Sequence, residues 1–164
     1  MKTTQFLLAF VAVSSLMLAG CGKSEAPPAT PAGKTADAHD HGEHTHGAGP
    51  HGGTIADWGA GKYHVEFTVD HDKKEAAVYV LGGDEKTAAP IAANNGELLL
   101  TINQPAFQVT LKATPQAGES AGVSSKFVGS HDNLGKVQEF AGTISGEVDG
   151  TPYAGDFKEE AHDH

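Results

Sequence analysis

The stretch GKYHVEFTVD, residues 61–70, alternates apolar and polar side chains, and this alternation decides the fold class. Successive side chains of a β-strand point to opposite faces of a sheet, so a period of two indicates a strand with one buried face. The apolar set that shares one face is Tyr63, Val65, Phe67 and Val69. A polar cluster, DHDKK, follows, and the apolar run EAAVYVL returns as a second strand. Residues 62–81 therefore predict a β-hairpin.

Short strand patterns continue toward the C-terminus. The runs GELLLTI, AFQVTLKA and SKFVG occupy residues 96–102, 106–113 and 125–129. In residues 139–160, Asp149-Gly150 separates two alternating runs, which is typical of a two-residue hairpin turn. The segment SHDNLGKVQ has the composition of a single helical turn.

Six to eight short strands in about 110 residues indicate an all-β domain over residues 51–160. We expect an antiparallel β-sandwich of the immunoglobulin-like kind, with a small β-barrel as the alternative. Residues 161–164 form a His-rich tail after this domain.

The N-terminus has the organisation of a secretory signal. Met1-Lys2 is a short positive region, and residues 6–18 are apolar apart from two serines, which is too short for a membrane span. The run ends in Leu18-Ala19-Gly20-Cys21, which resembles the lipobox of bacterial lipoproteins. This resemblance implies a signal peptide over residues 1–20 and lipidation of Cys21. The alternative is an ordinary secretory signal with an incidental cysteine.

The amino-acid composition of the chain after the signal indicates a tether and excludes some partners. Residues 21–50 are rich in Pro, Ala, Gly and His without aromatic residues or apolar periodicity, so we expect a disordered tether. Cys21 is the single cysteine, which excludes an intramolecular disulfide, and both methionines lie in the signal. The net charge is -10, and all 11 basic residues are lysines. An acidic chain without arginine is unsuited to nucleic acid, so we expect no nucleic-acid partner.

Histidines gather on both sides of the predicted domain. Five of them fall within thirteen positions of the tether and its junction with the domain, and two more end the chain: His39, His41, His44, His46, His51, His162 and His164. In a flexible segment, His-x-His spacing lets two imidazoles turn toward one ion, and imidazole binds Zn, Cu(II) and Ni. These residues are candidate metal ligands; the alternative is a polar linker that merely favours histidine.

Two more candidate ligands lie on the first predicted strand. His64 and Glu66 are two residues apart, so both side chains leave the face opposite the apolar set. A histidine and a carboxylate in this arrangement can form two corners of a tetrahedral site, which His51 or a terminal histidine would complete. The alternative is a pair of solvent-facing polar residues.

The segment GPHGGTIADWGAGKYHVEFTVD, together with EAAVYVL and the closing AHDH, resembles an uncharacterised family of His-rich bacterial envelope proteins. Its members share a Pro-His-Gly-Gly element, a Tyr-His-x-Glu strand and a valine-rich strand, and they often end in histidines. This resemblance implies that His51, His64 and Glu66 are the shared polar positions.

No nucleophile elbow, cysteine nucleophile or His-Glu-x-x-His motif occurs, so we expect a protein that is not an enzyme. The sequence predicts a lipid-anchored, periplasm-facing envelope protein that binds Zn, Cu(II) or Ni as a buffer, a scavenger or a donor to an envelope metal-transport component. Gly22 rather than aspartate follows the cysteine, which favours the outer membrane over the inner. The alternative is a structural or protein-interaction lipoprotein with a hydrated, pH-responsive tether.

The lipobox resemblance generates a first prediction. Replacing Cys21 by Ser removes the thiol that would receive the lipid, so the protein should appear as a soluble or unprocessed species. Membrane fractionation and mass spectrometry of the N-terminus measure this outcome. Unchanged processing and unchanged membrane association of the Cys21→Ser variant would contradict the lipoprotein assignment.

Overall fold

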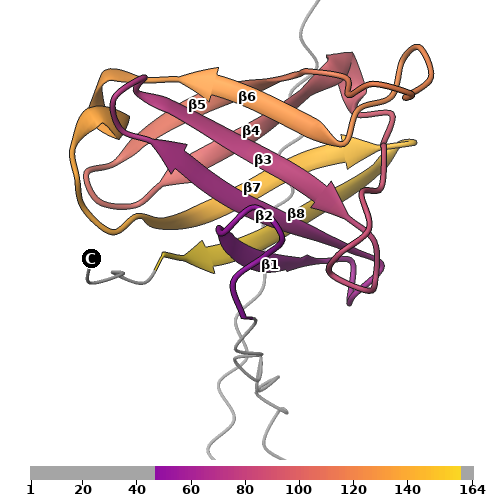
Figure 1. The fold of residues 1–164 in the computed structure, drawn as a ribbon, viewed down its shortest axis with the longest axis horizontal. Coiled ribbons are helices and arrows are strands. Elements are labelled where there is room, and N and C mark those ends of the chain that lie inside the picture. Colours follow the sequence, from indigo (N-terminus) through magenta and orange to yellow (C-terminus); the bar gives the residue numbers. More distant parts are fainter. Residues whose placement is uncertain (1–46, 160–164) are drawn as a thin grey trace, which may run out of the picture. The chain divides into compact units, whose positions relative to one another are not determined.

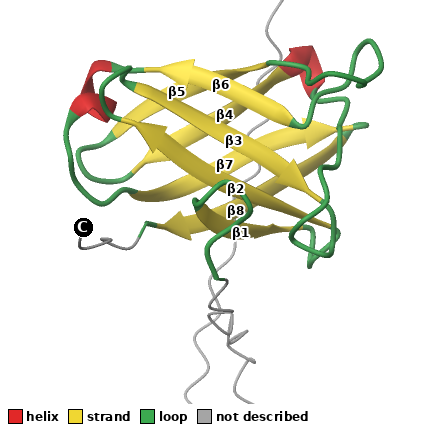
Figure 2. Cartoon of the chain, viewed as in Figure 1, coloured by secondary structure: helices red, strands yellow, loops and turns green. Residues whose placement is uncertain are grey.

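The computed structural model describes residues 47–159, which contain eight β-strands joined in one antiparallel sheet (Figure 1). The strands are β1 (Thr54–Trp58), β2 (Tyr63–Asp70), β3 (Glu75–Leu81), β4 (Glu97–Ile102), β5 (Phe107–Ala113), β6 (Lys126–Ser130), β7 (Ala141–Val148) and β8 (Thr151–Lys158). Two short 3₁₀ turns, Asn94–Gly96 and Asp132–Gly135, complete the described part (Figure 2). Nowhere in this part is there a helix with the length and apolar character to cross a membrane.

Two hairpins form where the sequence predicts them. In β2–β3, Phe67 pairs with Val78 and Asp70 pairs with Glu75. In β7–β8, Asp149 and Gly150 turn the chain with φ of 50° and 77°. Positive φ at both central residues is the geometry that matches the twist of a two-residue hairpin. The expected helical turn is also present, as Asp132–Gly135.

The sheet curls until its two end strands lie beside each other. Its order is β1-β2-β3-β6-β5-β4-β7-β8, and β1 contacts β8 (Figure 1). The indole N–H of Trp58 donates to the carbonyl of Ile144, 3.1 Å away. A Cβ added at Gly155 would lie 2.3 Å from the carbonyl oxygen of Asp57, so only glycine permits this approach. The all-β antiparallel prediction is confirmed, and the nearly closed single sheet has the form of the barrel alternative.

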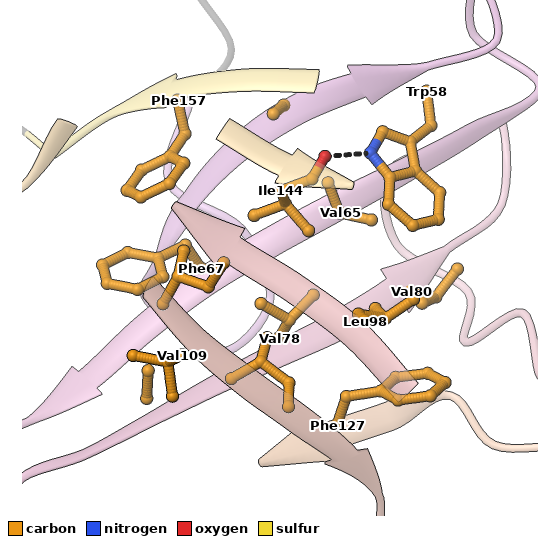
Figure 3. Packing of buried hydrophobic residues seen from close by; sticks show 14 of the residues in the cluster. Trp58, Val65, Phe67, Val78, Val80, Leu98, Val109, Phe127, Ile144 and Phe157 are labelled. Atoms are coloured by element: carbon orange, nitrogen blue, oxygen red, sulfur yellow. Dashed lines mark hydrogen bonds between the residues drawn. The ribbon is translucent and has the colours of Figure 1, made fainter. Parts of the chain in front are cut away.

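The apolar faces of the strands fill the interior of the curled sheet (Figure 3). The apolar alternation of β2 is confirmed at Val65 and Phe67, which are buried, and Phe67 stacks on Phe157 of β8. Other large side chains of this core include Trp58, Val78, Val80, Leu98, Leu100, Leu111, Phe127, Phe140 and Ile144. Because residues from both ends of the sheet meet here, burial of apolar area stabilises the closure as well as each hairpin.

Strand β1 was not among the predicted strands. Its five residues, TIADW, follow two glycines and show no long alternation, so local pattern does not distinguish them from a loop. Pairing with β2 in the register Thr54–Phe67 to Trp58–Tyr63 makes this segment a strand. It brings Asp57 opposite His64.

Adjacent leucines of β4 test the position of the core. Leu100 is fully buried, whereas Leu99 is 37% exposed on the outer face. Leu100→Ala should lower the free energy of unfolding by about 2–5 kcal/mol, because it leaves a cavity. Leu99→Ala, the matched control, should change it by less than about 0.5 kcal/mol. Denaturant unfolding followed by circular dichroism measures both; equal effects would contradict the inward-facing assignment of Leu100.

Candidate metal site

Glu66 is fully buried although its side chain leaves β2 on the outer face of the sheet. One carboxylate oxygen, Oε1, accepts hydrogen bonds of 2.8 Å from the backbone N–H groups of His51 and Gly53. The other, Oε2, lies 2.7 Å from Nδ1 of the His51 ring. The loop that precedes β1 therefore folds over Glu66 and removes the carboxylate from water, while three N–H groups replace the lost hydration.

Glycines allow this loop to come so close. The N–H of Gly49 donates to the carbonyl of Gly53, and the N–H of Gly52 donates to the carbonyl of Gly49, both at 2.9 Å. A Cβ at Gly53 would lie 2.1 Å from the carbonyl oxygen of Phe67, and one at Gly49 would lie 2.4 Å from Glu66 Cδ. The Gly-Pro-His-Gly-Gly segment is therefore shaped to cover Glu66, and no side chain fits at these two positions without displacement.

His51 is held in one orientation by two contacts. Its ring stacks on Tyr79 of β3, with centroids 3.6 Å apart and an interplanar angle of 7°. Because a carboxylate only accepts, Nδ1 carries a hydrogen and donates it to Glu66. In the neutral ring, Nε2 then holds the lone pair, on the side opposite Glu66. The His51 side chain as a whole is 41% exposed.

His64 shares the outer face of β2 with Glu66 but has different partners. The residue is only 4% exposed. Its Nδ1 donates to the carbonyl of Gly82 at 3.0 Å. Its Nε2 lies 2.9 Å from Asp57 Oδ1 and 3.5 Å from Glu85 Oε1. His64 and Glu66 thus share one face, as predicted, but each is covered by its own loop and neither is solvent-facing.

The loop after β3 positions Glu85. The carboxylate of Asp84 accepts hydrogen bonds from the hydroxyl of Thr87 and from the N–H groups of Thr87 and Lys86. These bonds favour the charged carboxylate and lower the pKa of Asp84 to about 2. The N–H of Gly82 also donates to the carbonyl of Thr87 at 2.8 Å, which closes the loop.

Asp57 and Glu85 were not predicted as site residues. Asp57 lies on the unpredicted strand β1, and only its register with β2 places it opposite His64. Glu85 lies in a polar loop whose composition indicates no more than a turn. A prediction of β1 would have identified Asp57 as the cross-strand neighbour of His64, whereas nothing local identifies Glu85.

The remaining predicted ligands and the lipidation site lie outside the described residues: Cys21, His39, His41, His44, His46, His162 and His164. Across residues 47–159, no three His, Cys, Asp or Glu side chains are arranged to hold a metal ion. What the described part supplies is one oriented, accessible imidazole at His51 and a second imidazole, His64, between two carboxylates.

Comparisons of the chain with models of protein families, with curated proteins and with solved structures find no match in any of the three. The resemblances to bacterial lipoproteins and to His-rich envelope proteins therefore stay predictions.

The buried carboxylate generates a prediction about stability. Glu66→Ala leaves the N–H groups of His51 and Gly53 without their acceptor, so the free energy of unfolding should fall by about 2–3 kcal/mol. Glu147→Ala, at an exposed position of β7, is the control and should change stability by less than about 0.5 kcal/mol. Denaturant unfolding of the two variants measures the difference. A Glu66→Ala variant as stable as the wild type would show that the loop does not depend on the carboxylate.

Proposed function

We propose that this protein is a lipid-anchored envelope protein that binds a divalent transition metal, with His51 as the ligand that the folded domain supplies. The observation that supports the proposal is the contact between Glu66 and His51 Nδ1 at 2.7 Å. Histidines that bind metal through one ring nitrogen usually donate the other N–H to a carboxylate or a carbonyl. That hydrogen bond selects the tautomer, orients the ring and raises the basicity of the metal-binding nitrogen.

The chain next to His51 supplies further imidazoles. His46 precedes His51 by five residues, so chain connectivity keeps their Cα atoms within about 18 Å. His44, His41 and His39 follow at short intervals toward the N-terminus. An ion on His51 can therefore recruit ligands from this run without a large rearrangement of the domain.

A fixed first ligand changes the energetics of binding. A flexible run must lose conformational entropy to close around an ion. An imidazole already held by Glu66 and Tyr79 has lost that freedom on folding, so less is lost when the ion binds. We therefore propose one tighter metal-binding site that includes His51, and several weaker sites on the His39–His46 run. Imidazole ligands suit Zn, Cu(II) and Ni.

The proposed cellular location of the protein follows from the predicted lipid on Cys21. An anchored domain with a metal-binding tether would hold ions at the membrane surface as a buffer or scavenger, or donate them to an envelope metal-transport component. The alternative function is a structural or protein-interaction lipoprotein. The stacking of His51 on Tyr79 favours it, because the same contacts would fasten a loop without any metal.

Two substitutions separate these functions. His51→Ala removes the proposed ligand, so it should abolish the tight metal-binding site and leave the weaker sites of the His39–His46 run intact. Glu66→Gln places an amide N–H₂ beside Nδ1, so the ring hydrogen should move to Nε2 and block metal binding there. We expect the affinity of the tight site to fall by about 10–100-fold in Glu66→Gln.

Calorimetry and equilibrium dialysis of the mature chain against Zn, Cu(II) and Ni measure these affinities. Glu147→Gln, which changes an exposed carboxylate in the same way, is the control and should bind as the wild type does. A third variant with His39, His41, His44 and His46 replaced by Ala should lose the weaker metal-binding sites. Unchanged binding in folded His51→Ala would exclude His51 as a ligand, and absence of micromolar binding to the wild type would favour the structural alternative.

A further inference from the structure

A hollow of about 640 Å³ lies on the outer face of the sheet, across β4, β7 and β8. These three strands are neighbours in the strand order (Figure 1). The pairing of β4 with β7 stops at Leu99–Ser145, although β4 begins two residues earlier, at Glu97, and β7 continues three residues further, to Val148. The hollow therefore opens where two adjacent strands stop pairing with each other.

The lining of this hollow combines apolar and acidic side chains. Leu99, which is 37% exposed, and the exposed residues Pro152 and Ala154 supply apolar surface. Glu97 and Glu147, both exposed, supply two carboxylates. None of the described residues that line the hollow is basic, and no ion pair within the described part includes either carboxylate. A ligand that complements this surface is cationic and carries some apolar area.

One wall of the hollow is held rigidly. Tyr153 lines it, and its ring stacks on the buried Trp58 with centroids 5.7 Å apart and an interplanar angle of 16°. The edge of Tyr63 also meets this ring, with centroids 5.7 Å apart. A wall that is fixed before a ligand arrives loses little conformational freedom on binding.

Two lysines lie next to the lining without being part of it. The Nζ of Lys62 donates to the hydroxyl of Tyr153 at 3.0 Å. Lys112 of β5 is the cross-strand partner of Glu97. Neither lysine forms an ion pair with Glu97 or Glu147 in the described part, so both carboxylates are available to a cation from outside.

We propose that this hollow binds an extended, lysine-bearing peptide segment of a partner protein. Side chains at positions i and i+2 of an extended chain point to the same side. Two lysines with this spacing therefore face Glu97 and Glu147 together, while their methylene stems cover the exposed part of Leu99.

The shape of the hollow and the charge of the chain favour such a segment. Sites for small molecules bury most of the ligand surface. This hollow is open to solvent, so a polypeptide can pass across it and continue on both sides. The net charge of -10 also attracts a basic segment over a longer range and speeds its encounter with the domain.

The test is an NMR titration of the ¹⁵N-labelled mature chain with the peptide acetyl-Ala-Lys-Ala-Lys-Ala-amide. EDTA is present throughout, so that no metal joins the peptide to the histidines. We expect saturable shifts of the backbone amides of Leu99, Ser145 and Ala154, with a dissociation constant below about 1 mM at low salt. Because the attraction is between exposed charges, raising the salt concentration should weaken binding. The peptide acetyl-Ala-Glu-Ala-Glu-Ala-amide is the control and should cause no saturable shift.

Three substitutions test the lining. Glu97→Gln and Glu147→Gln should each weaken peptide binding by about two- to fivefold, the range of an exposed ion pair. Leu99→Ala, which should leave the stability of the domain almost unchanged, should weaken binding by about fivefold because apolar contact is lost. Glu139→Gln, an exposed carboxylate outside the hollow, is the matched control and should bind as the wild type does.

Several outcomes would overturn the proposal: no saturable shift, shifts confined to other strands, equal binding of the glutamate peptide, or binding that none of the three substitutions weakens. Spermidine that binds as tightly as the peptide would also overturn it, because a free polyamine would then be the ligand. The metal site at His51 is a separate question. Glu147→Gln should weaken peptide binding and leave metal binding intact, so either proposal can fail without the other.

Discussion

The burial of one carboxylate, that of Glu66, is the constraint on which the site depends. Removing a charged carboxylate from water costs several kcal/mol unless N–H groups replace its hydration. Here the backbone of His51 and Gly53 and the ring of His51 do so. A loop that must bring these donors onto the face of a strand has no room for side chains at Gly49 and Gly53. The glycines and the orientation of the His51 ring both follow from that requirement.

The closure of the sheet is the second organising element. Trp58 inserts from β1 into the core and donates its indole N–H to Ile144 of β7, which ties one end of the sheet to the other. The loop over Glu66 leads directly into β1, and Asp57 of the same strand faces His64. The loop before β1 therefore carries the residues that contact Glu66, and β1 itself carries Asp57, which contacts His64. The geometry of both contacts depends on how this short strand packs. Because β1 contacts β8 as well as β2, closure restrains the strand from both sides.

Most of the fold was predictable because its signals are local. The alternation of β2, the return run of β3 and the Asp149-Gly150 turn each lie within a few residues, and the structure confirms them. The candidate site was predictable only in part. The shared face of His64 and Glu66 follows from the period of a strand, but their separate partners do not. Asp57 and Glu85 were missed because one needed strand register and the other needed the path of a loop.

The sequence alone determined the all-β class, the hairpins and the face of β2 on which the polar residues lie, since these depend on side-chain period and on turn residues close together in the chain. Tertiary structure decided that the sheet curls into a nearly closed form and that the outer face of β2 is covered. It also decided which partner each residue takes: Glu66 contacts His51, and His64 contacts Asp57 and Glu85. The physical reason is that these contacts join residues brought together by register and by loop paths, which the packing of the whole chain sets and no local pattern encodes.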